Sequence, residues 1–479
     1  MRGVAGSAFP AEAKGVGAAV LRTWDYGMWS SAFQNAAQNG LMVSNGIDIT
    51  QDPYYYTTDE NCREDSPYWN GVLQDTLRKV AEYREHASLL WWTVGNELES
   101  QVNWAAGNDC LWRRVEWLAA RVKAADPAHP VGTVLANIHA EKVGSIARLC
   151  PSLDFLGVNV YGNDAYNMGS NLRSMGWFKP HAITEYGVPG WWSVPTTSWG
   201  ARLETMTSRQ KAQFFTRTFN QCLAEPLCVG SWAFLWGWKW EKTGTWFGLF
   251  DQWDAAGAKN GPLDILYEIQ AGWLPGSPPP PVSILDFTVF NGRLESNVLG
   301  FSADRGALVR LDAKVSGDVD EIVWVVAPES DSYVDGNVLE NAETAVVGAV
   351  QACSSTGGSL VRGVLDTTKL AGASYRVYLF VRSKAGVTST ASAPFLIGQQ
   401  QCHTAVPGEA CYTEIFRIKA EQEARGVCLW PADALLTTST VQEFQASLHR
   451  ANWPYSGPCP APCSPHVPLG LPADCGAVV

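Results

Sequence analysis

The sequence contains few charged residues and no cluster of basic ones. Only 17% of its 479 residues are charged, and 47 acidic residues outnumber 35 lysines and arginines, which gives a net charge of −12. Nucleic acids and anionic membrane surfaces are bound mainly through clusters of lysine and arginine. We therefore expect neither of them as a partner, and a neutral ligand is the natural expectation.

Long apolar runs are also missing. No uncharged apolar stretch reaches the roughly 18 residues needed to cross a bilayer. The first 20 residues lack the charged start and the apolar core of a signal peptide. Taken alone, these absences indicate a cytosolic protein without a membrane span.

The cysteines point to a different compartment. Of 12 cysteines, six fall within the last 78 residues, namely Cys402, Cys411, Cys428, Cys459, Cys463 and Cys475. Their spacing fits neither a zinc ribbon nor a redox pair, so we expect disulfides and an extracellular or secretory location, with the signal peptide lost from this N-terminus. Elsewhere, Cys62 could pair with Cys110 and Cys222 with Cys228, although spacing does not settle the pairing.

Several kinds of catalytic motif are absent as well. The seven histidines are scattered and form no HExxH motif, so we expect no metal centre. No glycine-rich phosphate loop follows a predicted strand, and no Gly-x-Ser-x-Gly elbow is present. The chain is therefore expected to work without a cofactor.

Two short apolar runs each lead to a glutamate. Residues 89–97 read LLWWTVGNE and residues 182–187 read AITEYG, which is typical of strands buried on both faces. Glu97 and Glu185 are 88 residues apart, close to three strand–helix units of about 31 residues in an α/β barrel. We expect them on the fourth and seventh strands, facing each other across the barrel mouth.

The rest of the pattern favours an α/β chain in several parts. Alternating strands and helices predict a (β/α)8 TIM barrel over residues 1–274. Only about 20 residues precede the strand of Arg22, so the first strand is expected to be stunted or lost. Residues 275–282 form a proline-rich linker, residues 283–398 predict an immunoglobulin-like β-sandwich, and residues 399–479 form a cysteine-rich module with one helix at 441–450.

A facing pair of carboxyl groups has the chemistry to cleave a glycosidic bond. In a retaining glycosidase one carboxylate attacks the anomeric carbon, while the other, kept protonated about 5 to 5.5 Å away, protonates the leaving oxygen. Asn96 offers an amide to a sugar hydroxyl, and Arg22 and Tyr161 can keep Glu185 ionised and aligned. One glutamate ending a strand can equally be a solvated rim residue, but two at barrel spacing favour catalysis.

Tryptophan is abundant in the predicted barrel. Of 22 tryptophans, 19 precede residue 274. Aromatic faces stack on the apolar faces of sugar rings, although most of these side chains are expected to fill the barrel and its helix layer. We expect Trp236 and Trp238 to line the cleft.

Five motifs resemble, in order, the strand ends of clan A glycoside hydrolases. They are LRTW at 21–24, GNE at 95–97, GVNVYG at 157–162, ITEYG at 183–187 and AFLWG at 233–237. The likeness covers about residues 13–273 and extends in particular to the barrel-only relatives of glycoside hydrolase family two and to the β-1,3-glucanosyltransferases.

The resemblance implies a role for each matched residue. Glu97 would be the acid/base and Glu185 the nucleophile. The residues that would orient substrate or nucleophile are Arg22, Asn96, Asn159 and Tyr161. Trp236 would form the floor of the subsite for the cleaved sugar.

These observations lead us to expect a secreted retaining glycoside hydrolase that cleaves β-linked oligo- or polysaccharides. If a sugar hydroxyl replaces water in attacking the intermediate, the same residues make a transglycosylase. A third interpretation is a catalytically inactive glycan-binding or cell-wall protein, for which the short barrel start, the predicted sandwich and the cysteine-rich tail leave room.

Overall fold

The chain divides into two compact units. The computed structural model describes residues 1–63, 65–100, 109–205, 207–251, 261–290, 294–296, 300–329, 345–353, 359–398, 410–425, 441 and 444–445. The barrel unit comprises Met1–Pro189, Lys211–Lys239 and Phe247–Pro280, and the second unit comprises Gly190–Gln210, Trp240–Trp246 and Pro281–Val479. Two segments that interrupt the barrel sequence therefore belong to the second unit.

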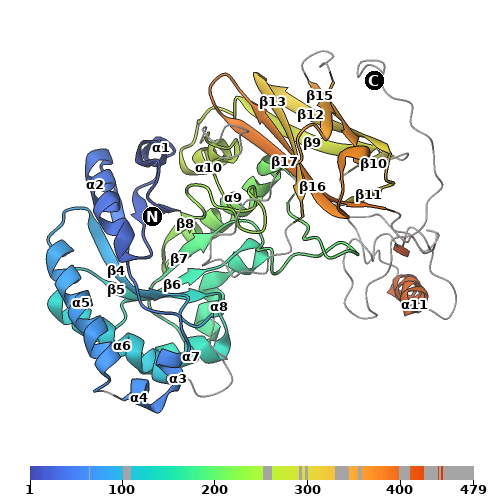
Figure 1. Cartoon of the computed structure of the whole chain (residues 1–479). Coiled ribbons are helices and arrows are strands. Elements are labelled where there is room, and N and C mark those ends of the chain that lie inside the picture. The colour runs from blue at the N-terminus through green and yellow to red at the C-terminus, as the bar shows by residue number, and fades with distance from the viewer. Residues whose placement is uncertain are drawn as a thin grey trace. The chain divides into compact units, whose positions relative to one another are not determined.

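Eight parallel strands close the barrel in sequence order (Figure 1). They are β1 (Arg2–Ala5), β2 (Val20–Arg22), β3 (Met42–Ile47), β4 (Leu89–Asn96), β5 (Val131–Ala136), β6 (Phe155–Asn159), β7 (His181–Tyr186) and β8 (Cys228–Ala233). The short strand β1 pairs with both β2 and β8. Of the two sequence-based alternatives, the stunted first strand is correct, and no strand is missing from the ring.

Helices connect the barrel strands. They are α1 (Pro10–Gly15), α2 (Trp29–Asn39), α3 (Tyr54–Thr57), α4 (Asp59–Cys62), α5 (Pro67–Tyr83), α6 (Asp109–Ala125), α7 (Ala140–Leu149), α8 (Met168–Ser174), α9 (Ser208–Ala224) and α10 (Ile265–Trp273). Helix α6 has one buried apolar face, because Leu111, Val115, Leu118 and Val122 are each at most 1% exposed. In the described part of the chain, no helix has both the length and the apolar character needed to span a bilayer.

Large aromatic side chains from alternate strands fill the barrel. Trp91 of β4 lies with its ring centroid 4.3 Å from that of Phe155 of β6 and 5.4 Å from that of Trp232 of β8. Side chains from alternate strands form one layer in such barrels. Gly3 of β1 leaves room for the Trp232 ring, since a Cβ atom at this position would lie 2.4 Å from it.

Both disulfides that the sequence suggested for the barrel are present. Cys62 is bonded to Cys110, and Cys222 to Cys228. Cys353 and Cys411 are disulfide-bonded as well. The remaining tail cysteines, Cys402, Cys428, Cys459, Cys463 and Cys475, lie outside the described residues.

The second unit contains two further sheets, in which the pairing is antiparallel except between β11 and β17 (Figure 1). One has the order β10 (Leu294–Ser296), β9 (Val282–Phe290), β12 (Leu308–Gly317), β15 (Leu360–Asp366), β14 (Val350–Ala352). The other has the order β11 (Phe301–Ala303), β17 (Thr388–Ile397), β16 (Ser374–Arg382), β13 (Glu321–Pro328). Phe287 of β9 and Trp324 of β13 have ring centroids 6.1 Å apart, so the two sheets contact each other.

A helix in the tail was not expected from the sequence. It is α11 (Ala410–Arg425), in which Ile415 and Ile418 are at most 1% exposed. The helix predicted at 441–450 lies outside the described residues except at positions 441, 444 and 445.

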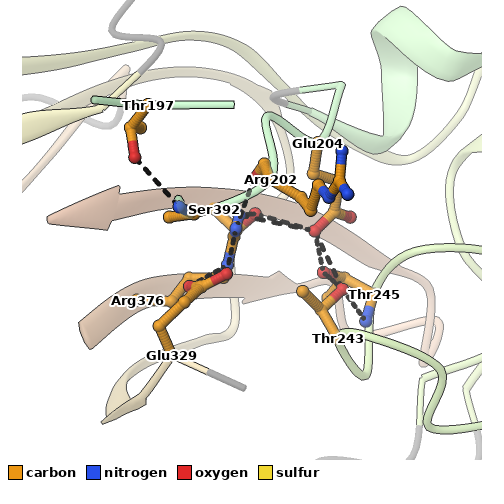
Figure 2. A network of polar contacts seen from close by, with 9 residues as sticks. Thr197, Arg202, Glu204, Thr243, Thr245, Glu329, Arg376 and Ser392 are labelled. Carbon is orange, nitrogen blue, oxygen red and sulfur yellow. Dashed lines mark hydrogen bonds and ion pairs between the residues drawn. The ribbon is translucent and has the colours of Figure 1, made fainter. Parts of the chain in front are cut away.

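A buried carboxylate, Glu204, joins the two inserted segments to the sheets of the second unit (Figure 2). It follows β7 in the chain, and its Oε2 accepts hydrogen bonds from Thr243 Oγ1 (2.9 Å) and Ser392 Oγ (3.1 Å). Arg376 of β16 lies 3.8 Å from the same oxygen and forms a bidentate pair with Glu329 at 2.8 and 2.9 Å. Since Arg376 is 0% exposed, three buried charges depend on one another.

Replacing Arg376 with methionine should therefore destabilise the protein strongly. The substitution leaves Glu204 and Glu329 buried without their cation, which costs about 3–5 kcal/mol for a broken buried ion pair. Denaturant unfolding of the whole chain measures the effect. Lys384→Met, two residues beyond the end of the same strand, is the control, because both side chains of its ion pair with Asp318 are exposed (71% and 59%), and a loss below about 1 kcal/mol is expected there. Equal losses in both variants would contradict the prediction.

Candidate active site

The candidate residues come together at the carboxyl ends of the barrel strands. Arg22 ends β2, Asn96 ends β4 and Asn159 ends β6. Glu97 directly follows β4, and Glu185 is the fifth residue of β7, which are the strands expected from their spacing. Catalytic groups in parallel barrels lie at this rim.

Three donors surround the Glu185 carboxylate, which is 5% exposed. Arg22 Nη1 donates to Oε1 at 2.6 Å, Trp24 Nε1 donates to the same oxygen at 2.7 Å, and Tyr161 Oη donates to Oε2 at 2.5 Å. Hydrogen bonds to an ionised acceptor are short and strong, and they favour the anion. The three donors thus hold the carboxyl group in one orientation, as a nucleophile requires.

Glu97 experiences the opposite environment. Loss of hydration and the negative charge of Glu185 raise the pKa of the Glu97 carboxyl to about 8, with a smaller contribution from Glu99. A hydrogen bond from Asn159 Nδ2 to Oε1, at 2.8 Å, and the charge of Arg22 partly oppose this rise. At neutral pH Glu97 therefore carries a proton. A neutral acid and a fixed carboxylate in one site can act as proton donor and nucleophile.

Arg22 connects the two carboxyl groups through side-chain amides. It is 1% exposed, and its Nη2 donates to Asn96 Oδ1 at 2.7 Å, while Nη1 lies 3.3 Å from Asn159 Oδ1. Asn159 Nδ2 also donates to Asn96 Oδ1, at 3.0 Å. The Asn96 oxygen is therefore fully used by protein donors. Its Nδ2 has no hydrogen bond to any described residue, so it is free to donate to a ligand hydroxyl.

The aromatic residues after β8 do not all lie where the sequence suggested. Trp236 is 1% exposed and its Nε1 donates to the Ala8 carbonyl at 2.8 Å, so it offers no open face to a sugar, contrary to expectation. Phe234 instead lies edge-on to Trp24 and Tyr161, with ring centroids 6.3 and 5.7 Å apart. Trp238 is half-buried and remains a candidate for the cleft.

Sequence reasoning missed Trp24 and Phe234. Trp24 lies two residues beyond Arg22, and residues two apart in an extended segment lie on the same face. Because Arg22 was already assigned to the site, Trp24 could have been assigned to it as well. No such rule identifies Phe234, because β8 ends at Ala233 and alternation stops with the strand. In the part of the chain that is described, no group of three or more histidine, cysteine or acidic residues could hold a metal ion.

Comparison with known proteins gives similarity only among solved structures. No protein-family model matches the sequence, and no curated protein matches it. A β-D-glucuronidase from Dictyoglomus thermophilum is 17% identical over 56% of this chain and 47% of its own, with a TM-score of 0.39. A β-glucuronidase from Ruminococcus gnavus is 14% identical over 58% and 50%, with a TM-score of 0.41.

A GH39 β-xylosidase from Caulobacter crescentus is 12% identical over 74% of this chain and 91% of its own, with a TM-score of 0.40. The match spans about half the length of the two glucuronidases. At this identity and overlap, the function has to be inferred from the chain's own residues.

Replacing Trp24 with phenylalanine should lower kcat/KM on an activated β-glycoside, the class of substrate proposed below, by about tenfold to a hundredfold. The ring is kept, but Glu185 Oε1 loses a 2.7 Å hydrogen bond, and a hydrogen bond to a charged group contributes about 1.5–3 kcal/mol. Steady-state kinetics with a nitrophenyl glycoside measure the change. Trp117→Phe on α6, where the ring contacts Arg121, should leave the kinetics unchanged. An equal loss there would refute the role of Trp24 as a specific donor to Glu185.

Proposed function

We propose that this protein is a retaining glycoside hydrolase acting on β-linked glycans. The observation that carries the proposal is the contrast between its two carboxyl groups. Glu185 has three donors on its oxygens, and the pKa of Glu97 is raised to about 8, partly by the charge of Glu185. Asn159 donates to Glu97 and lies 3.3 Å from Arg22 Nη1, which donates to Glu185. One polar cluster therefore holds both carboxyl groups, which supports a double displacement.

In the proposed mechanism the two groups act in sequence. A Glu185 oxygen attacks the anomeric carbon while Glu97 gives its proton to the departing glycosidic oxygen, so that the C–O bond breaks and a glycosyl-enzyme ester forms. Glu97, now ionised, removes a proton from water, whose oxygen attacks the same carbon and releases Glu185. We infer that the Nδ2 of Asn96 holds a sugar hydroxyl and that Trp238 lines the cleft.

The proposal extends to the parts of the chain. We infer that residues 1–274 form the catalytic domain, 275–282 a linker, 283–398 an immunoglobulin-like sandwich and 399–479 a cysteine-rich module. The strand orders β9-β12-β15-β14 and β17-β16-β13 support the sandwich, since they equal the ABED and GFC orders of that fold. The disulfides Cys62–Cys110 and Cys222–Cys228 are compatible with secretion.

A hydrolysis screen tests the proposal. The whole chain is incubated with aryl β-glycosides and with β-glucan, mannan and galactan, and proton NMR identifies the first anomer released. Retention of the β configuration is expected. Release of the α anomer would contradict the double displacement. Sugar binding without hydrolysis of any substrate would favour the non-catalytic binder, and longer products with excess acceptor would favour the transglycosylase.

A further inference from the structure

The backbone at Glu97 has a conformation that needs support. Its φ is +51°, which is uncommon for a residue with a side chain, and Gly95, two residues earlier, has a φ of +74°. Such a conformation costs of order 1–3 kcal/mol and persists only where the surroundings fix it. The Glu97 N–H donates to the Val134 carbonyl of β5 at 3.0 Å, which fixes the start of the turn.

A buried ion pair fixes the other side of the turn. Glu99, two residues after Glu97, is 1% exposed and accepts hydrogen bonds from the Ala136 N–H at 2.7 Å and from Lys142 Nζ at 2.8 Å. Lys142 of α7 is 5% exposed, and its Nζ also donates to the carbonyls of Ala136 and Asn137 at 2.7 and 3.1 Å. The segment after β4 is thus attached to the end of β5 and to α7.

The same contacts continue to the side chain of Glu97. Asn137 has a φ of +61°, and its N–H donates to the Asn159 carbonyl at 2.8 Å. The Asn159 side chain in turn donates to Glu97 Oε1 at 2.8 Å. Both the backbone and the carboxyl of Glu97 are therefore held by one continuous set of contacts through the ends of β5 and β6.

Stability alone does not explain this ion pair. A buried pair gains little over apolar side chains of the same size, because desolvation of two charges offsets their attraction. The pair is also too deeply buried to touch a substrate. Glu99 is one of the charged residues that influence the pKa of Glu97, together with Glu185 on β7 and Arg22 on β2. Asn159 faces the same carboxyl from β6 as a neutral donor.

We propose that the Glu99–Lys142 ion pair is a positioning device that holds the turn of Glu97 and whose two charges offset each other beside the Glu97 carboxyl. This inference rests on the proposed function, in which Glu97 is the proton donor. Neither residue touches the reacting atoms.

Opposite charge changes at the pair test the idea. Glu99→Gln removes the carboxylate and leaves the ammonium, so the alkaline limb of kcat/KM should move to lower pH by roughly one unit. Lys142→Met leaves the carboxylate unbalanced, and the limb should move to higher pH by a similar amount. The double variant should return it close to the wild-type position, and Lys142→Arg should resemble the wild type.

A pair with a purely structural role would behave differently. It would lower the folded fraction in each variant and leave the alkaline limb in place. If the limb keeps its wild-type position in both single variants, or moves in the same direction in both, the inference is wrong. Lys123→Met is the matched control, because its partner Asp154 lies next to the amino end of β6, at the opposite rim, and no shift is expected there.

A second measurement separates this inference from the proposed function. Carbon-13 NMR of labelled glutamate follows the titration of the Glu97 carboxyl without any substrate, and its signal is assigned by its loss in Glu97→Gln. Opposite displacements of the titration midpoint in Glu99→Gln and Lys142→Met would support the charge balance even if the wild type cleaves no glycoside. An unmoved midpoint in an active enzyme would refute the inference and leave the proposed function standing.

Discussion

Replacing Glu185 with alanine should abolish turnover of an activated aryl β-glycoside, with a loss of roughly 10⁴-fold or more, as for other covalent nucleophiles. Added azide should restore product formation and yield a glycosyl azide of inverted configuration. The alanine leaves room beside Arg22, Trp24 and Tyr161, which hold the carboxylate in the wild type. Azide in that space can attack the anomeric carbon from the side on which the Glu185 carboxylate lies in the wild type. The glycosyl azide then remains as the product, because no residue cleaves it.

The azide product is measured by proton NMR, whose coupling at the anomeric position reports its configuration. Glu85→Ala is the matched control, because its side chain is 88% exposed, and it should react like the wild type. A glycosyl azide of retained configuration, or an active Glu185→Ala enzyme without azide, would remove Glu185 from the role of nucleophile.

Glu97→Gln should lower the rate for substrates with poor leaving groups by about 10² to 10⁴-fold, the usual contribution of a proton donor. Wild-type activity should also fall on the alkaline side near pH 8, because the pKa of Glu97 is about 8 and the donor must be protonated. The variant should lose this limb, since glutamine has no proton to titrate. A pH profile of kcat/KM for both proteins, with an unactivated phenyl β-glycoside, checks the two expectations together.

The same substitution should make the protein more stable at alkaline pH. The pKa of Glu97 rises from 4.5, its ordinary value, to about 8 on folding, so the folded protein keeps a proton that the unfolded chain releases. Wild-type stability therefore falls as the pH rises from about 4.5 to about 8. The gain in Tm of Glu97→Gln over the wild type should grow across this window. A constant difference would show that Glu97 titrates normally.

Much of the barrel could be predicted because its signals are local. The runs that end near Glu97 and Glu185 are apolar throughout, as strands buried on both faces must be, and the spacing of their glutamates counts the strands between them. Arg22 and Tyr161 were expected beside Glu185 from their chemistry, and Asn159 from the resemblance of its motif to a clan A strand end. The glutamates, their strands and the polar contacts of Arg22 and Tyr161 with Glu185 are present as expected.

What could not be predicted depends on contacts between distant residues. The first strand is only four residues long, too short to show a period, and it forms because β2 and β8 supply partners on both sides. Trp236 and Phe234 are both aromatic and both buried, and only their surroundings decide which of them contacts Tyr161. The second unit takes in Gly190–Gln210 and Trp240–Trp246 because residues such as Glu204 have partners far along the chain, for which the sequence gives no local sign.

The partners of Glu204 have a consequence for how the protein is made. Ser392, which donates to its carboxylate, is 188 residues away in the chain, so a ribosome has released Glu204 well before it has synthesised this partner. The Glu204 carboxylate therefore lacks its Ser392 partner, and can stay hydrated, until β17 has emerged. Contacts across such long sequence distances slow folding and prolong exposure to aggregation. The polar network around Glu204 can therefore be completed only after β17 has been synthesised.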